Sequence, residues 1–415
     1  MRRAWTNRYI APMDMQTAPS AHALAMARSL VGMNTVSRNS NLALIHFIRD
    51  ELARHGVSST LTFDDGGGKA NLFATVGEGK PAGVIVSGHT DTVPWDGQDW
   101  SLDPLGADVK DGRLYGRGSA DMKGFIGLAV AQVPAWLAAD LPFAVHLAFS
   151  YDEEVGGFGA RRLIADMRDR GVAPLACIVG EPTGMVPALA HKGVYRWRCC
   201  VKGKAAHSSL TPQAVNAIEV GARVIGKLAD MSARWRDGPA RYEGFDVPYT
   251  TGSVGVIEGG IADNVVPEDC RFNYEFRNLP GADAADMQQE VLAYAASLEP
   301  AMKAVAPAAG IAFETICEMP AFLARADDVA VLLAQRLAAA EGTTLVAFGT
   351  EAGLFQRAGV PTVVCGPGHI AQAHQADEYV SLAQLAAAER FLQALAMVDA
   401  ASLVSRPATS SGRPA

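Results

Sequence analysis

The chain has 415 residues, of which 49% are hydrophobic and 19% charged, and 36 basic and 44 acidic side chains give a net charge of −8. This length predicts two domains, or one large and one small, with ample material for a core. Lysines and arginines form no block that could follow a phosphate backbone, and no run of about 18 apolar residues occurs, so the composition argues against nucleic-acid binding and against a membrane span.

The first part of the chain alternates between helical and strand-like patterns. Residues 1–18 are polar and irregular and are expected to form a loose arm, whereas 21–33 and 40–56 repeat apolar residues at helical spacing. Ser40 is a plausible N-cap for the second helix, and 122–138 is expected to form an apolar helix. Short β-branched and apolar runs indicate buried strands at 84–86, 145–149, 177–179 and 363–365. Buried strands alternating with helices predict an α/β domain whose central sheet is mostly parallel.

The middle of the chain has a different pattern. The expected elements follow in the order strand, helix, strand, strand, helix at 194–202, 213–232, 252–258, 269–277 and 283–298. An order β-α-β-β-α-β fits a small α+β domain. We expect it to occupy 194–314, inserted between the two parts of the larger domain at 19–193 and 315–403. The tail, 404–415, is rich in Ser, Pro, Arg and Ala and is expected to be disordered.

The cysteines and the N-terminus bear on the cellular compartment. The six cysteines form no Cys-x-x-Cys pair and most lie in apolar runs, which indicates buried thiols in a reducing compartment. The residues after Met1-Arg2-Arg3 do not form an apolar run of signal length. We therefore expect a cytoplasmic protein.

Acidic and histidine side chains follow three of the predicted buried strands. These are His89 with Asp91, then Asp152-Glu153-Glu154, then Glu181. Ligands of open α/β sheets bind just outside the carboxyl ends of the strands. The sequence therefore predicts that these side chains gather at one edge of the sheet and form a site there.

Two further residues could complete a metal site, although each has an ordinary alternative. Asp121 lies among glycines at the start of an apolar helix, where it could be a simple helix cap, and His374 alone could be a surface or core histidine. Together with the strand-end residues they make a nitrogen and oxygen ligand set suited to zinc or cobalt: His89, Asp121, Glu154, Glu181 and His374. The three acids and a hydroxide would balance the charge of two divalent ions. Of the two adjacent glutamates, one could bind metal while its neighbour acts as a base on metal-bound water.

Five motifs, in order along residues 31–395, resemble the dinuclear zinc peptidase family, which includes acetylornithine deacetylase, succinyl-diaminopimelate desuccinylase, aminoacylase and a glutamate carboxypeptidase. The motifs are Ser87-Gly88-His89-Thr90-Asp91, Gly116-Arg117-Gly118 with Asp121-Met122-Lys123-Gly124, Asp152-Glu153-Glu154-Val155-Gly156, Gly180-Glu181-Pro182-Thr183 and Ala373-His374-Gln375-Ala376-Asp377-Glu378. The resemblance implies a zinc-peptidase α/β domain with a ferredoxin-like lid that often dimerises, so a homodimer through the lid is expected.

The resemblance also implies how two zinc or cobalt ions would be held. Asp121 matches the aspartate that bridges both ions. His89 and Glu181 match the terminal ligands of one ion, and Glu154 and His374 those of the other.

Outside the ligands, the resemblance implies roles in catalysis and substrate binding. Glu153 matches the general base, and Asp91 matches the carboxylate that orients the ligand His89. His207 matches a lid histidine that stabilises the oxyanion in the partner subunit's site, and Asn264 matches another polar contact of the lid. Arg277 matches the arginine that binds the substrate α-carboxylate. The alternatives are a turn residue for His207 and a salt bridge on the strand face for Arg277.

Within the family, further motifs most resemble the acetylornithine deacetylase branch. They are Thr35-Val36-Ser37-Arg38-Asn39-Ser40, Ala190-His191-Lys192-Gly193 and Phe348-Gly349-Thr350-Glu351-Ala352-Gly353. This implies hydrolysis of a small N-acyl amino acid, N2-acetyl-L-ornithine, and we hypothesise that Glu351 recognises the free side-chain amine. The alternatives are another N-acyl-amino-acid amidohydrolase such as a succinyl-diaminopimelate desuccinylase, a carboxypeptidase or dipeptidase, and a non-catalytic sensor.

Overall fold

The computed structural model describes residues 17–80 and 83–398, and its larger lobe is built on a nine-stranded sheet. The strand order is β1-β2-β6-β3-β7-β15-β8-β13, with β14 pairing to β8. The strands are β1 (Ser59–Phe63), β2 (Ala70–Val76), β3 (Val84–His89), β6 (Val145–Ser150), β7 (Ala176–Pro182), β8 (Ala188–His191), β13 (Phe322–Leu323), β14 (Thr344–Val346) and β15 (Thr362–Gly366). The expected N-terminal arm and C-terminal tail lie almost wholly outside the described residues.

The centre of this sheet is parallel, as the sequence predicted. Strand β3 pairs in parallel with β6 and with β7, and β7 pairs in parallel with β15. The outer pairs β1–β2, β2–β6, β15–β8 and β8–β13 are antiparallel, so the whole sheet is mixed. Strands β3, β6, β7 and β15 are buried along their full lengths, because helices cover both faces of the sheet.

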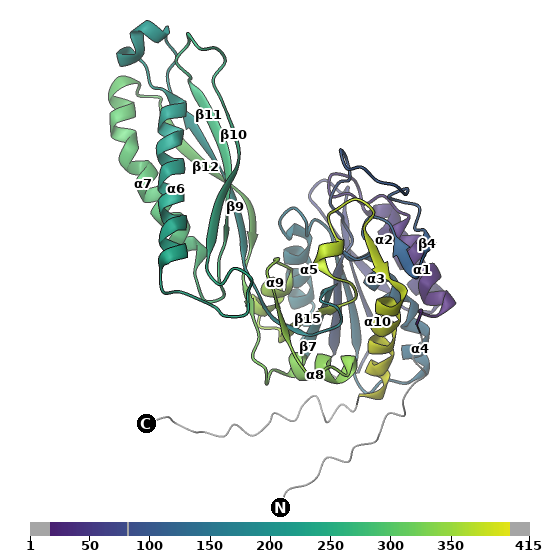
Figure 1. Ribbon diagram of the computed structural model, residues 1–415. Coiled ribbons are helices and arrows are strands. Elements are labelled where there is room, and N and C mark those ends of the chain that lie inside the picture. The colour runs from purple at the N-terminus through teal and green to yellow at the C-terminus, as the bar shows by residue number, and fades with distance from the viewer. Residues whose placement is uncertain (1–16, 81–82, 399–415) are drawn as a thin grey trace, which may run out of the picture.

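Helices α5 and α9 lie on one side of the sheet and α3 and α10 on the other (Figure 1). The helices of this lobe are α1 (Ala21–Val31), α2 (Leu42–Arg54), α3 (Lys123–Ala131), α4 (Val133–Ala138), α5 (Phe158–Asp169), α8 (Val329–Ala338), α9 (Ala352–Arg357) and α10 (Leu382–Ala394), with short 3-10 turns at Ile370–Gln372 and Leu395–Met397. A small sheet of β4 (Val109–Lys110), β5 (Arg113–Tyr115) and β16 (Tyr379–Ser381) lies beside them.

The expected helix at 122–138 is two helices, α3 and α4, because Pro134 in the first turn of α4 has no amide hydrogen for a continuous ladder. The N-cap of α2 is Asn41, although the Ser40 hydroxyl accepts a hydrogen bond from the Leu42 amide.

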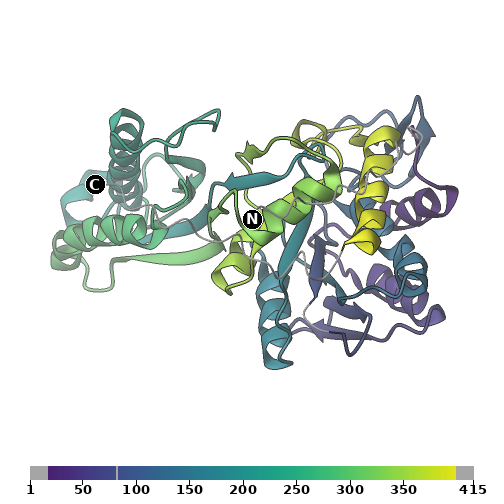
Figure 2. The same ribbon diagram turned by 90° about the horizontal axis from the view of Figure 1, so that it is seen from below.

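The smaller lobe is a separate four-stranded antiparallel sheet with strand order β10-β11-β9-β12. Its elements are β9 (Val194–Lys202), a 3-10 turn (Ser208–Gln213), α6 (Ala217–Asp237), β10 (Thr251–Gly259), β11 (Asp269–Arg277), α7 (Ala284–Val305) and β12 (Gly310–Met319). This confirms the order β-α-β-β-α-β. Helices α6 and α7 cover one face of the sheet (Figure 1), and Figure 2 shows the lobe standing away from the larger one.

Alternation along β9 explains how this sheet forms. Tyr195, Trp197, Cys199 and Val201 are buried in the core of the lobe, whereas the residues between them face the open side. The expected end of the inserted domain, residue 314, falls inside strand β12, which runs to Met319. The domain boundaries stay a prediction.

Two global expectations concern the cysteines and the membrane. All six cysteines are unpaired, and five of them are buried. No helix in the described parts of the chain is long and apolar enough to cross a membrane.

Candidate metal centre

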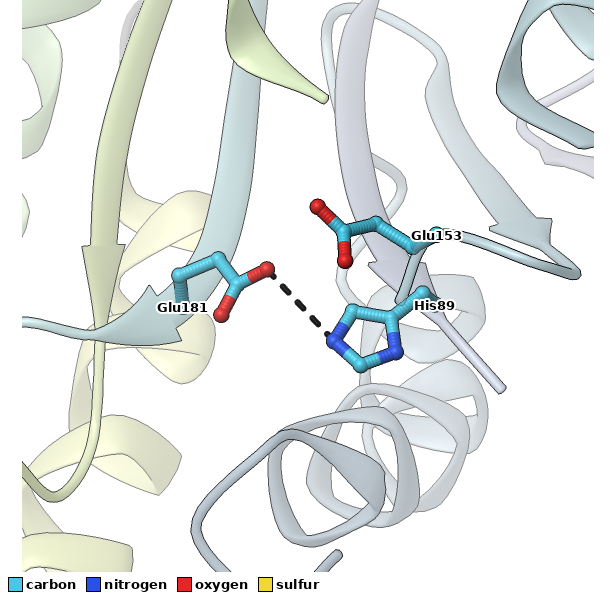
Figure 3. Close-up of side chains that lie close together, drawn as sticks. All are labelled: His89, Glu153 and Glu181. Carbon is cyan, nitrogen blue, oxygen red and sulfur yellow. Dashed lines mark ion pairs between the residues drawn. The ribbon is translucent and has the colours of Figure 1, made fainter. Parts of the chain in front are cut away.

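The carboxyl ends of the central strands bring three predicted site residues together. His89 is the last residue of β3, Glu181 lies near the end of β7, and Glu153 follows β6. Figure 3 shows their side chains pointing into one space. One ligand atom from each of the three lies within 4.8 Å of the others. The parallel pairing of β3 with both neighbours places these strand ends at the same edge, as predicted.

Asp121 reaches this cluster from the loop before α3 and lies between two histidines. Its Oδ1 is 2.8 Å from His89 Nε2, and its Oδ2 is 3.1 Å from His374 Nε2. Each oxygen of one carboxylate therefore faces a different histidine, an arrangement that fits a carboxylate shared by two ions.

The remaining pairs divide into two sets around Asp121. His89 Nε2 is 3.5 Å from Glu181 Oε1, and His374 Nε2 is 3.2 Å from Glu154 Oε1. Ligand atoms about 2.1 Å from a tetrahedral zinc ion lie roughly 3.4 Å from one another. The donor types and their spacing thus fit two divalent ions, one on the His89 side and one on the His374 side.

The electrostatics of the cluster also favour cations. Burial raises the pKa of Glu153 and of Glu181, and the Asp121 charge raises that of Glu181 further. Burial alone would lower the pKa of His374, but hydrogen bonds to Asp121 and Glu154 outweigh it and raise that pKa to about 11. In the absence of another cation, protons therefore compensate the negative charge of this buried cluster, and bound metal ions would take over that role.

Asp91 lies behind His89 and connects it to the acidic loop. The Asp91 carboxylate accepts hydrogen bonds from the Ser37 hydroxyl at 2.7 Å and from the backbone N–H groups of Glu153 and Glu154 at 3.0 and 3.3 Å. Its Oδ1 is 3.6 Å from His89 Nδ1, and that ring nitrogen is 3.0 Å from the Asp91 backbone carbonyl, which fixes the ring orientation.

The structure does not bring His207 and Asn264 to this cluster. Both lie in the smaller lobe beyond the far end of β9, where the Ser208 N–H donates to the Asn264 carbonyl. Arg277 ends β11, beside the connection between the lobes, and its guanidinium pairs with Glu275 at 3.1 Å. The sequence could not predict this separation, because it depends on how the lobes are arranged.

Glu351 lies beneath the cluster. The residue is fully buried, and its two carboxylate oxygens accept hydrogen bonds from the Ser87 hydroxyl at 2.5 Å and the Ser150 hydroxyl at 2.7 Å. A substrate amine could reach this buried carboxylate only if the surrounding residues moved, so the recognition role stays a prediction. Ser87 and Ser150 are buried polar strand residues next to site residues, and that signal could have suggested a hidden partner.

Sequence reasoning gave no role to Arg117 and Glu378, which form a fully buried ion pair of 2.7 Å. Both lie in motifs that carry predicted ligands. A charged residue beside a predicted ligand could have suggested a role in holding that ligand in place.

A family model described as peptidase family M20/M25/M40 matches residues 85–398. The chain is 34% identical over 362 residues to an acetylornithine deacetylase from Proteus mirabilis, covering 86% of this chain and 89% of that protein. It is 35% identical over 381 residues to an acetylornithine deacetylase from Myxococcus xanthus, covering 89% and 95%.

Solved structures share the fold. A structure described as an M20 family metallo-carboxypeptidase from Sulfolobus solfataricus matches with a TM-score of 0.71 at 15% identity, covering 91% of this chain and all of that one (100%). Human carnosine dipeptidase 1 matches with a TM-score of 0.67 at 18% identity, covering 91% and 97%. At such identities the likeness concerns the fold alone.

Proposed function

The chain belongs to peptidase family M20/M25/M40, as its motifs predicted, and on that premise we propose that it hydrolyses the amide bond of N2-acetyl-L-ornithine to L-ornithine and acetate, a step of arginine biosynthesis. Two observations together support the proposal. Histidines and carboxylates lie on both sides of Asp121, and relatives named acetylornithine deacetylase match most of the chain.

The cluster would hold two zinc ions, or cobalt ions, through its own residues. We propose that His89 and Glu181 bind one ion, that Glu154 and His374 bind the other, and that Asp121 contacts both. Bound there, the ions would act as Lewis acids on the scissile carbonyl and would make water acidic enough to attack near neutral pH. Asp91 would keep the His89 ring in the orientation that binds.

Glu153 is the proposed general base. Its side chain points toward the space beside His89 and Glu181, as Figure 3 shows, and a ligand atom of each of the three lies within 4.8 Å of the others. The two pairs around Asp121 already supply the proposed ligands, which leaves Glu153 to act on water. Its carboxylate would accept a proton from the attacking water and then pass it to the nitrogen of the departing amine.

The smaller lobe would supply substrate contacts, with Asn264 beside His207. The Nδ1 atom of His207 accepts a hydrogen bond from the Ser209 N–H, which leaves Nε2 as the ring nitrogen that would donate a hydrogen bond to an oxyanion. Arg277 at the other end of the lobe would bind the α-carboxylate through its guanidinium, after release from Glu275.

We further propose a homodimer through the smaller lobe. Strand β9 has nine residues and therefore runs roughly 30 Å away from the connection, so His207 lies beyond the reach of the cluster in its own subunit. Strand β10 is an edge strand, and the exposed Val256 (52%), Ile257 (53%) and Ile261 (88%) on and after it offer apolar surface to a second copy.

The test is a substrate panel. Purified protein, metal-free or loaded with zinc or cobalt, is incubated with N2-acetyl-L-ornithine, N-succinyl-diaminopimelate, N-acetylmethionine and several dipeptides, and the released amine is measured. We expect release of ornithine to be fastest and to stop when a chelator is added. A preference for another substrate would contradict the acetylornithine assignment, and no hydrolysis of any substrate by the metal-loaded protein would contradict enzymatic function.

A further inference from the structure

We propose that Glu378 is a positioning residue that locks the loop carrying Asp121 against the loop carrying His374 and so sets the affinity of the centre for metal. This inference rests on the proposed function, because it assumes that divalent ions bind between these two loops. No contact of Glu378 with substrate or with an ion is involved.

The contacts of the Glu378 carboxylate are concentrated on the Asp121 loop. Its Oε1 atom accepts hydrogen bonds from the backbone N–H groups of Gly118 at 3.0 Å, Ala120 at 3.0 Å and Asp121 at 3.2 Å. Its Oε2 atom accepts a hydrogen bond from Arg117 at 2.7 Å. Both oxygens of the Glu378 carboxylate are therefore bound by the segment that carries Asp121.

This arrangement requires an anion and a particular backbone. Several N–H groups that converge on one point form an anion-binding concavity, and an ionised acceptor strengthens each bond. Gly118 has φ +83°, a conformation that glycine adopts readily, and a Cβ there would lie 2.5 Å from Lys123 Cε. Glu378 is fully buried and Arg117 is 1% exposed, so water cannot replace either partner without opening the loop.

A second set of contacts returns to the His374 loop. Arg117 also donates to Gln98 Oε1 at 2.5 Å and stacks its guanidinium over the Trp100 ring at 5.1 Å. The Gln98 amide donates in turn to the His374 backbone carbonyl at 2.9 Å. A continuous chain of contacts therefore runs from Glu378 through Arg117 and Gln98 to the backbone of His374.

This chain of contacts helps to set the position of two proposed ligands relative to each other. Asp121 Oδ2 and His374 Nε2 lie 3.1 Å apart, on loops that are also joined by the pairing of β5 with β16 and by the hydrogen bond from the Gly116 N–H to the Glu378 backbone carbonyl. The side chain of Glu378 adds the contacts that reach Asp121 itself. His374 itself has φ +61°, a left-handed conformation that needs support from its surroundings. Loss of the Glu378 charge should loosen both loops, and loss of groups that orient ligands typically weakens metal binding about 10- to 100-fold.

The experiment compares metal binding by full-length wild type, Glu378→Gln and Glu389→Gln. Glu389, on α10, is a matched control because it is also a buried carboxylate, 2% exposed. It accepts hydrogen bonds from the Ser20 N–H at 2.7 Å and the Ser20 hydroxyl at 2.6 Å. Each protein is stripped of metal and titrated with zinc in competition with a chromogenic chelator. A parallel cobalt titration records the visible absorption, which reports ligand geometry.

We expect wild type to bind two ions, and Glu378→Gln to bind at least one of them about 10- to 100-fold more weakly with an altered cobalt spectrum. Glu389→Gln should lose thermal stability but keep wild-type affinity and spectrum. Wild-type affinity and spectrum in folded Glu378→Gln would overturn the inference. Should that variant not fold, Arg117→Lys replaces the two guanidinium nitrogens that bond Glu378 and Gln98 with a single ammonium nitrogen. It should also weaken metal binding, and wild-type metal binding in it would overturn the inference instead.

The two levels of the proposal can be told apart. Absence of metal binding by wild type would overturn the proposed function together with the role of Glu378. Two tightly bound ions in wild type and in Glu378→Gln alike would overturn only the positioning role.

Discussion

Replacement of Asp91 tests how the site is held together before any metal binds. In Asp91→Ala, the N–H groups of Glu153 and Glu154 lose their acceptor, whereas the Ser37 hydroxyl keeps the Thr92 carbonyl at 3.3 Å. A donor left without a partner costs about 1–3 kcal/mol. Because the hydrogen bonds of these two N–H groups are part-buried, water can reach the freed groups, and we take the lower bound of about 1 kcal/mol for each. The free energy of unfolding of the metal-free protein should therefore fall by about 2 kcal/mol.

Asp91→Asn is the matched variant, since its single amide oxygen can still accept from the Glu153 N–H, whereas the Glu154 N–H loses its acceptor. It should cost about 1 kcal/mol, for the loss of that one hydrogen bond. Urea unfolding in the presence of chelator measures both values. An Asp91→Ala protein within about 0.5 kcal/mol of wild type would refute the reasoning, because that is the scatter of substitutions without structural consequence.

Zinc adds a second readout for the same variants. If the loss of Asp91 weakens zinc binding about 10- to 100-fold, zinc-dependent stabilisation should shrink by about 1.4–2.7 kcal/mol at saturating zinc. The His89 ring keeps its contact with the backbone carbonyl of residue 91 in both variants, so binding should weaken without being abolished. Equal zinc stabilisation in wild type and Asp91→Ala would contradict a role for this carboxylate in orienting His89.

Three further predictions use other residues. Glu153→Gln should lower kcat about 10²- to 10⁴-fold while two zinc ions still bind, as steady-state kinetics and metal analysis would show; unchanged kcat would exclude it as the base. Glu351→Gln should reduce kcat/KM for acetylornithine far more than for acetylmethionine if the carboxylate recognises the amine, whereas an equal reduction would point to support of Ser87 and Ser150. Burial lowers the pKa of His146 and of His191 to about 4. Each of these histidines stays neutral in the folded chain, whereas in the unfolded chain it takes up a proton below about pH 6.5. As the pH falls from about 6.5 to 4, each histidine should therefore lower the free energy of unfolding by up to roughly 1.4 kcal/mol per pH unit. Urea unfolding across that range should show a flatter profile in His191→Phe, and an identical profile would contradict the assignment.

The secondary structure that follows from local pattern was predictable from the sequence. Buried β-branched and apolar runs gave the central strands, and alternation gave β9. Helix α7 was harder, because the predicted helix at 283–298 stops before Pro300, whereas α7 continues to Val305. Proline removes one hydrogen bond from the helix, but Met302, which packs in the core of the lobe, lies beyond it, and that tertiary contact supports the longer helix.

By itself, the sequence determined which side chains could gather at the edge of the sheet, because the end of a strand and the residue that follows it are local properties. What only the tertiary structure decided are the contacts between distant segments. Glu378 bonds the Asp121 N–H across 257 residues, and Glu351 reaches Ser87 across 264. How far the smaller lobe stands from the larger one likewise depends on how the two lobes are joined. The spacing of residues along the chain does not predict such partners, because they depend on tertiary packing and on the need of a buried charge for hydrogen bonds.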